Sequence, residues 1–166
     1  VGNAGNITAY WKGYREYADA GHSDTLPRMM GFQAAGAAPF VEDAFIGNPE
    51  TIASAIRIGK PASWQPAKAA LQFSAGTIDK VTDEEILSAY QMITAQEGIF
   101  VEPASAAALA GIIKLQNAGK IDEGSIVVAT MTGHGLKDPD NAVEHANMEA
   151  TTVEPTLDAV KAAIGI

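Results

Sequence analysis

The sequence predicts an α/β fold with a mainly parallel, open sheet, and two observations carry this prediction. Short apolar runs typical of strands alternate along the chain with longer stretches that have the three-to-four residue spacing of helices. The clearest run, from Ser125 to Met131, is rich in β-branched residues, as expected for a strand covered on both faces. At 166 residues, with 47% apolar and 19% charged side chains and no internal repeat, residues 1–166 are interpreted as a single piece.

Each predicted element rests on a local signal. Asn48 followed by Pro49 is typical of a helix start, and Thr82 with Glu85 forms a capping box before the next long helix. The predicted helices span residues 7 to about 21, 48 to 58, 63 to 73, 83 to 97, 104 to 118 and 157 to 164. The predicted strands span residues 28 to 35, 77 to 81, 99 to 101 and 125 to 131. A polar loop is expected before Pro155.

The charge balance excludes several classes of partner. Eleven Lys and Arg stand against 20 Asp and Glu, a formal net charge of −9, so we expect no nucleic-acid partner and no binding to anionic membranes. No apolar run approaches the roughly 20 residues that span a bilayer. The chain has no cysteine, and its histidines lack partners at metal-ligand spacing, so no metal site is expected. Any anionic ligand must therefore be held locally.

The first candidate site is the loop that opens the sequence: Gly2, Asn3, Ala4, Gly5 and Asn6. Glycines let a backbone approach a ligand closely, and the helix that follows presents unpaired N–H groups at the positive end of its dipole. The loop could therefore cradle a phosphate. The alternative is a purely conformational turn, because Gly and Asn are common before helices. It is neither a Walker A loop nor the dinucleotide-binding glycine pattern.

Two further candidates follow predicted strands, where ligands bind in open α/β sheets. Thr132 opens a glycine-rich turn and could offer its hydroxyl to a ligand, whereas His134 could be a base but is more typically a structural hydrogen-bonding residue. Lys137 and Asp138 are interpreted as a surface pair or as residues that form a turn, rather than as an acid–base couple. Glu102 is either a partly buried, tuned carboxylate or a helix-start carboxylate that complements the dipole of the next helix.

Five segments, taken in order, carry a resemblance to a known family: GNAGNITAYWKGY, FQAAGAAPF, TIASAIRIGKPASW, EGIFVEPASAAALAG and ATMTGHGLKDPD. They resemble the threonine synthases of the shorter, bacterial and plant-like type, which are fold-type II pyridoxal-phosphate enzymes. The GNAGN loop discriminates best, because cysteine synthases and serine/threonine dehydratases usually carry GTGGT-like or GGGG-like loops there. Lys60 departs from the asparagine expected in RIGNPAS. The resemblance implies the tryptophan synthase β-like architecture, an open parallel sheet with helices on both faces.

The resemblance also implies an activity and a site. The family converts O-phospho-L-homoserine and water to L-threonine and phosphate with pyridoxal 5'-phosphate. Backbone N–H groups of the Gly2–Asn6 loop would hold the cofactor phosphate, and Asn6 would also reach the substrate phosphate. Thr132 would hydrogen-bond the pyridine nitrogen, and Glu102 would lie near the cofactor. A cytoplasmic homodimer with no nucleic-acid or membrane partner is expected.

The family's Schiff-base lysine lies well upstream of the GNAGN loop, and none of the chain's eight lysines lies in such a motif. We therefore expect residues 1–166 to be the C-terminal part of the large cofactor-binding domain, inactive without the lysine-bearing segment. Two alternatives stay open. One is another fold-type II lyase such as threonine dehydratase, and the other is a non-catalytic module that binds an anion or a protein partner.

Overall fold

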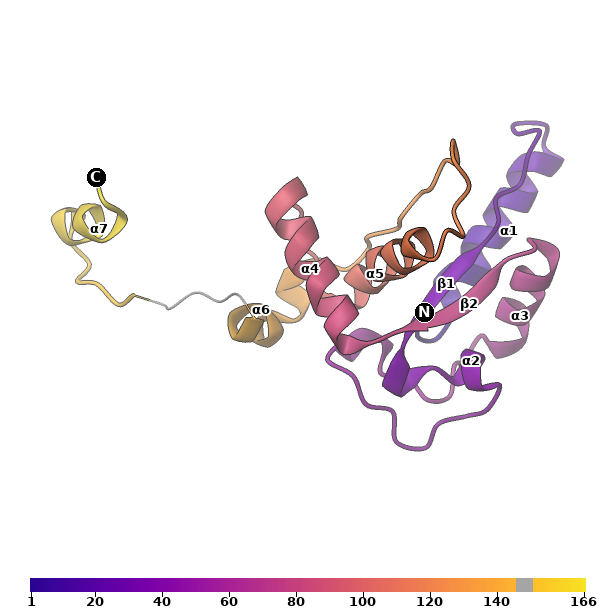
Figure 1. The fold of residues 1–166 in the computed structure, drawn as a ribbon, viewed down its shortest axis with the longest axis horizontal. Coiled ribbons are helices and arrows are strands. Elements are labelled where there is room, and N and C mark those ends of the chain that lie inside the picture. Colours follow the sequence, from indigo (N-terminus) through magenta and orange to yellow (C-terminus); the bar gives the residue numbers. More distant parts are fainter. Residues whose placement is uncertain (146–150) are drawn as a thin grey trace.

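The computed structural model describes residues 1–145 and 151–166 and places a small parallel sheet between two helical layers (Figure 1). The helices are α1 (Gly5–Asp19), α2 (Pro39–Glu42), α3 (Trp64–Phe73), α4 (Asp83–Glu97), α5 (Pro103–Asn117), α6 (Pro139–His145) and α7 (Leu157–Ile164). The strands are β1 (Met30–Ala34) and β2 (Thr77–Val81), and three short 3-10 turns cover 35–37, 54–56 and 135–137. No described helix has the length and apolar content needed to cross a membrane.

The sheet is formed by β1 and β2, which run parallel in a register that pairs Met30 with Thr77 and Ala34 with Val81. Successive side chains of a strand point to opposite faces. On one face, Phe32 packs with α4 and α5, and on the other, Gly31 lies against Ile7 of α1. Helices therefore cover both faces of the pair, and this confirms the predicted α/β class with a parallel sheet.

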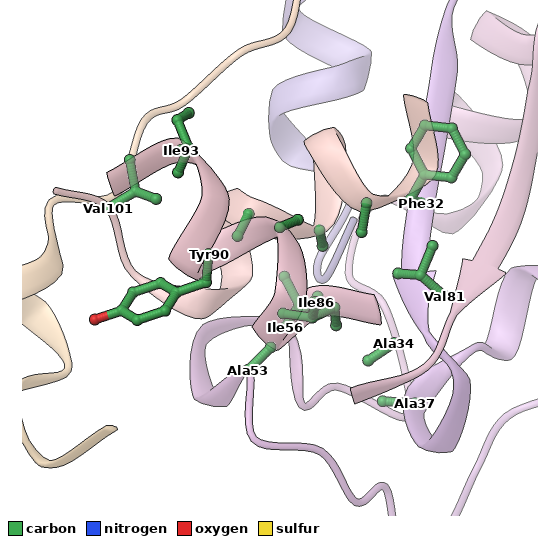
Figure 2. Packing of buried hydrophobic residues seen from close by; sticks show 14 residues of the cluster. Phe32, Ala34, Ala37, Ala53, Ile56, Val81, Ile86, Tyr90, Ile93 and Val101 are labelled. Atoms are coloured by element: carbon green, nitrogen blue, oxygen red, sulfur yellow. The ribbon is translucent and has the colours of Figure 1, made fainter. Parts of the chain in front are cut away.

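The main core lies between the sheet and the helical pair α4–α5 (Figure 2). Phe32, Val81, Ile86 and Ile93 supply its bulky side chains, whereas α5 presents a surface of alanines and Gly111. Small residues let α5 approach the sheet closely: a Cβ added at Gly111 would lie 2.2 Å from the ring of Phe32. The alanine-rich sequence of α5 is thus explained by close packing against β1.

The capping box predicted before α4 is present in full. The Thr82 hydroxyl accepts a hydrogen bond from the Glu85 N–H at 3.1 Å, and the Glu85 carboxylate accepts one from the Thr82 N–H at 2.7 Å. These bonds satisfy two of the N–H groups that a helix start leaves unpaired. The helix then ends at Gly98, which adopts the left-handed conformation with φ 66°.

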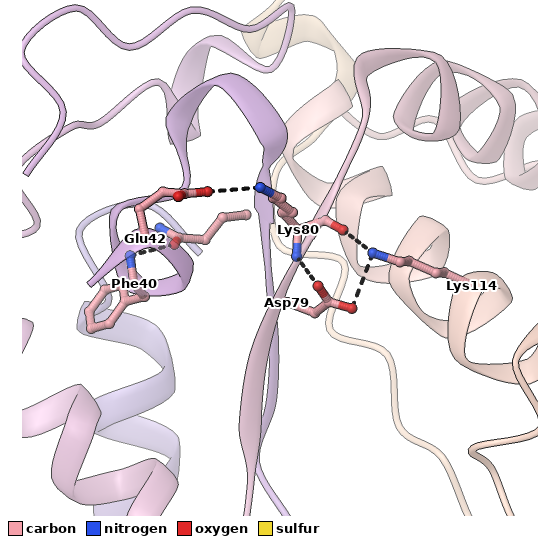
Figure 3. Close-up of polar contacts among 6 residues, drawn as sticks. Phe40, Glu42, Asp79, Lys80 and Lys114 are labelled. Atoms are coloured by element: carbon pink, nitrogen blue, oxygen red, sulfur yellow. Dashed lines mark hydrogen bonds and ion pairs between the residues drawn. The ribbon is translucent and has the colours of Figure 1, made fainter. Parts of the chain in front are cut away.

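Charged side chains tie the sheet to helices on either side of β2 (Figure 3). Lys80 pairs with Glu42 of α2 at 2.8 Å, and Lys114 of α5 pairs with Asp79 at 3.1 Å. Burial by itself raises the pKa of Asp79, but a hydrogen bond from the Lys80 N–H and the nearby Lys114 outweigh it and hold the pKa below its usual value. Asp79 is therefore a charged link between β2 and α5.

The helix predicted over residues 48 to 58 is wrong. Only Ser54–Ile56 forms a short 3-10 turn there. Side chains take the backbone groups that a helix would use: Arg57 Nε donates to the Thr51 carbonyl at 2.9 Å, and the Ile52 N–H donates to Asp83 at 3.1 Å. The Asn48–Pro49 signal was local, and these longer-range bonds override it.

Two of the predicted strands are also wrong. Residues 125–131 have no regular structure, and Ile126 and Val128 are 94% and 77% exposed. A strand needs a neighbouring backbone to pair with, and no described residue pairs with this run. Of residues 99 to 101, Val101 makes a single antiparallel bridge to His134. Helix α6 occupies part of the predicted polar loop, and positions 146–150 of that loop lie outside the described residues.

Candidate functional site

The opening loop is shaped by close contact with a second loop, residues 55–63. Gly2 is buried there, and a Cβ added to it would lie 3.1 Å from Ile58 Cδ1 and 3.2 Å from the Ala55 carbonyl oxygen. Asn3 fixes the same contact, because its side-chain oxygen accepts from the Ala62 N–H at 3.2 Å and its carbonyl accepts from the Ser63 N–H at 3.0 Å. A side chain at Gly2 would displace this packing.

The loop leads into α1 with its N-terminal donors uncovered. Ala4 occupies the N-cap position in the left-handed conformation, with φ 63°, and no side chain caps the helix. Gly5 and Asn6 in the first turn are exposed, and a Cβ added at Gly5 would meet nothing within 4 Å. First-turn N–H groups and the positive end of the helix dipole therefore face open space, an arrangement suited to an anion such as phosphate.

Glu102 and the turn after residue 131 are brought together, although the two strands predicted to precede them are absent from the described residues. The Glu102 N–H donates to the Gly133 carbonyl at 3.0 Å, and the Gly135 N–H donates to the Phe100 carbonyl at 3.1 Å. The bridge between Val101 and His134 lies between these two bonds. A short antiparallel contact therefore presents Glu102 beside the turn that carries Thr132.

Glu102 is buried, at 6% exposed, and its side chain fills the space beside Gly133. A Cβ added at Gly133 would lie 1.7 Å from Glu102 Oε1, so only glycine leaves room for the carboxylate. Lys137 Nζ lies 3.4 Å from the same oxygen, with most of its own side chain exposed. A buried carboxylate is costly unless paired, and Lys137 provides the opposite charge. Lys137 is thus more than the surface residue that the sequence suggested.

Thr132 and His134 differ in whether their side chains are available to bind a ligand. The Thr132 side chain is exposed, and its hydroxyl makes no hydrogen bond to any part of the chain that the structure describes. His134 instead serves its own turn: Nδ1 accepts from the Leu136 N–H at 3.1 Å, and the ring packs edge-on against Phe100 with centroids 5.6 Å apart. The structural interpretation of His134 is favoured over a catalytic base.

The loop at Gly2 and the turn at Thr132 are linked through the segment between them. Ala55 and Ile58 of this segment contact Gly2, while Ser54 Oγ donates to Asp138 at 2.8 Å. Within residues 1–145 and 151–166, no hydrogen bond or ion pair joins Gly2–Asn6 directly to Glu102 or Thr132. The opening loop and the Thr132 turn are thus two candidate half-sites, and both contact the 54–58 segment.

The carboxylate of Asp138, which binds Ser54 of the 54–58 segment, is ionised. Partial burial raises its pKa, but hydrogen bonds from Asn141 and Ser54 outweigh that effect, and the pKa lies below the usual 3.8. The carboxylate thus accepts hydrogen bonds in its ionised form. Sequence reasoning placed Asp138 with Lys137 as a surface pair, and the long-range bond to Ser54 was not visible in that pattern.

Sequence reasoning also missed Ser105. This residue is 6% exposed in the first turn of α5, and its hydroxyl accepts from the Gly133 N–H at 2.8 Å. The signal was a single hydroxyl in a stretch of alanines, PASAAALAG, where the helix needs none. A buried side-chain hydroxyl in such a run points to a specific backbone partner.

Comparison of the sequence with known proteins places this chain in a family. The pyridoxal-phosphate dependent enzyme family matches residues 1–133. Threonine synthase of Synechocystis sp. is 52% identical over 166 residues, covering 99% of this chain and 43% of that protein. Threonine synthase of Mycobacterium leprae is 60% identical over 144 residues, covering 87% of this chain and 40% of that protein. The chain thus spans less than half the length of these relatives.

A solved structure agrees at the level of the fold. The processed form of threonine deaminase isoform 2 from Solanum lycopersicum superposes with a TM-score of 0.64 over 90% of this chain and 41% of that one, at 19% identity. The tomato structure shows that the arrangement of sheet and helices is shared. Together with the family match over residues 1–133, these findings show that the chain belongs to the pyridoxal-phosphate dependent enzyme family.

Proposed function

We propose that the protein containing these residues is a threonine synthase, which forms L-threonine and phosphate from O-phospho-L-homoserine and water. The observation that carries the proposal is the GNAGN loop, whose sequence discriminates within the family and whose backbone donors are uncovered at the start of α1. Relatives of that name at 52% and 60% identity support it. On the same resemblance we propose a cytoplasmic homodimer.

The residues present fit pyridoxal 5'-phosphate. Gly5 leaves open space at the start of α1, where an added Cβ would meet nothing within 4 Å, and the first turn supplies uncapped N–H donors. The loop from Gly2 through Asn3, Ala4 and Gly5 to Asn6 would therefore hold the cofactor phosphate. The exposed Thr132 hydroxyl would hydrogen-bond the pyridine nitrogen. The buried Glu102 would hold the turn that presents Thr132.

The roles of the chain's own residues follow from their chemistry. Bound pyridoxal phosphate would supply an electron sink for the carbanions that form at Cα and then at Cβ of the substrate. The α1 donors would fix the cofactor by its phosphate, and the Asn6 amide would bind the substrate phosphate. The Thr132 hydroxyl is a neutral donor that does not ionise at neutral pH, so it would orient the cofactor ring through a hydrogen bond without protonating the ring nitrogen.

The lysine that anchors the cofactor in this family has no counterpart among residues 1–166. We propose that these residues form the C-terminal part of the large cofactor-binding domain, and that the anchoring lysine belongs to the other part of the protein. The two half-sites described above would then be the share of the cofactor site that this part contributes.

The test is an assay of the complete protein loaded with pyridoxal 5'-phosphate. Release of phosphate with formation of L-threonine from O-phospho-L-homoserine is expected, and Asn6→Ala should reduce it mainly through a higher KM. Asn48→Ala, an exposed asparagine outside the proposed site, is the matched control and should behave as the parent. Formation of 2-oxobutyrate from threonine instead would establish the dehydratase alternative, and neither product would favour a non-catalytic module.

A further inference from the structure

We propose that Ser105 is a positioning residue, whose buried hydroxyl fixes the Thr132–Gly133 peptide and thereby sets where the Thr132 side chain lies. The inference rests on the proposed function, because it gives Thr132 its place at the cofactor ring. It adds a residue on another element, α5, that acts on the cofactor without touching it.

The contacts of Ser105 converge on one residue. Ser105 Oγ accepts from the Gly133 N–H at 2.8 Å and lies 3.4 Å from the Gly133 carbonyl oxygen, to which it donates. The same carbonyl also accepts from the Glu102 N–H at 3.0 Å. Both backbone polar groups of Gly133 are therefore held by the start of α5.

The N–H that Ser105 binds belongs to the peptide plane joining Thr132 to Gly133. A peptide unit is planar, so holding this N–H fixes the orientation of the plane and with it the backbone rotation at Thr132. The Thr132 side chain itself is exposed and bound by nothing in the described residues. The direction of its Cα–Cβ bond is consequently set by its backbone, and Ser105 holds that backbone through the Gly133 N–H.

The helix does not need a hydroxyl at this position. Glu102 is the N-cap of α5 and makes no side-chain capping bond, and Ser105 lies three positions further on. Alanine has the higher intrinsic helix propensity. The polar contact to Gly133 is the one feature of Ser105 that alanine would not reproduce, and it faces the proposed site.

The experiment is a double-mutant cycle on the complete protein, measured as the dissociation constant for pyridoxal 5'-phosphate and as the absorbance spectrum of the bound cofactor. Ser105→Ala should raise the dissociation constant by up to about tenfold, which corresponds to losing the one hydrogen bond that Thr132 would give to the cofactor, and should shift the spectrum. In a Thr132→Val background, where the hydroxyl is already lost, the same change should have little further effect. Ser105→Thr, which keeps a hydroxyl, should restore most of the affinity.

Ser74→Ala provides the matched control. Ser74 is also buried, accepts from the Met29 N–H at 3.2 Å and donates to the Leu71 carbonyl at 3.3 Å, but it lies at the end of α3. It should lower thermal stability to a similar extent and leave the cofactor spectrum unchanged. Equal effects of Ser105→Ala with and without Thr132, or a spectral change in Ser74→Ala, would overturn the inference. A protein that shows the coupling but does not convert O-phospho-L-homoserine would overturn the proposed function alone.

Discussion

Replacing Gly111 by alanine should destabilise the fold, although alanine is the better helix former. The added Cβ would lie 2.2 Å from the Phe32 ring, where ordinary contact begins near 3.4 Å, so the ring must move by roughly 1 Å. Phe32 is buried against α5, and overpacking of this kind costs about 1–3 kcal/mol. The higher helix propensity of alanine offsets this cost by only about 1 kcal/mol. We expect a net loss of about 0–2 kcal/mol in the free energy of unfolding.

Urea unfolding followed by circular dichroism measures this loss, with Gly13→Ala as the matched control. Gly13 lies inside α1, and a Cβ there would meet nothing within 4 Å, so that variant should gain about 0.5–1 kcal/mol. Adding Phe32→Leu to Gly111→Ala should cost less than the two separate losses together, because the smaller side chain makes room. A Gly111→Ala protein as stable as Gly13→Ala would refute the close packing of α5 on β1.

Three further changes test other parts of the structure. Thr82→Ala removes the capping box of α4 and should lower the free energy of unfolding by about 1 kcal/mol in the same urea assay, whereas an unchanged midpoint would contradict the cap. Gly133→Ala drives a Cβ into the Glu102 carboxylate and should weaken pyridoxal 5'-phosphate binding in a fluorescence titration; unaltered affinity would argue against this contact. The folded-state pKa of Asp138 lies below 3.8, so its contribution to stability is present above about pH 4 and is lost as the pH falls through the folded-state value. Asp138→Asn should therefore flatten the acid side of the stability profile, and a profile of unchanged slope would count against the bond to Ser54.

Elements with complete local signals could be predicted from the sequence. The Thr82 capping box and the alternation of residues 77–81 located α4 and β2, and the spacing of Ile7 and Trp11 located α1. In each case the residues that determine the element lie within it or directly beside it. The Gly2–Asn6 loop was found for the same reason, because glycine content and a following helix are local properties.

Features that depend on distant partners could not be predicted. The segment around Thr51 carries a good helix start, yet its backbone groups are taken by Arg57 and by Asp83 on another element. The contact of Ser105 with Gly133 joins positions that no periodicity relates. The apolar run at 125–131 has the composition of a strand, but pairing is a property of two segments rather than of one.

The connection between the two paired strands has a consequence for the order in which the chain folds. All of residues 35–76 lies between β1 and β2, so the parallel pair closes a long loop before any ladder bond forms. By contrast, α4 and α5 are joined by a few residues and pack directly on each other. Helical hairpins with such local contacts form early, and long-range parallel pairing is slow. The β1–β2 sheet is therefore expected to assemble late, on a helical pair already in place.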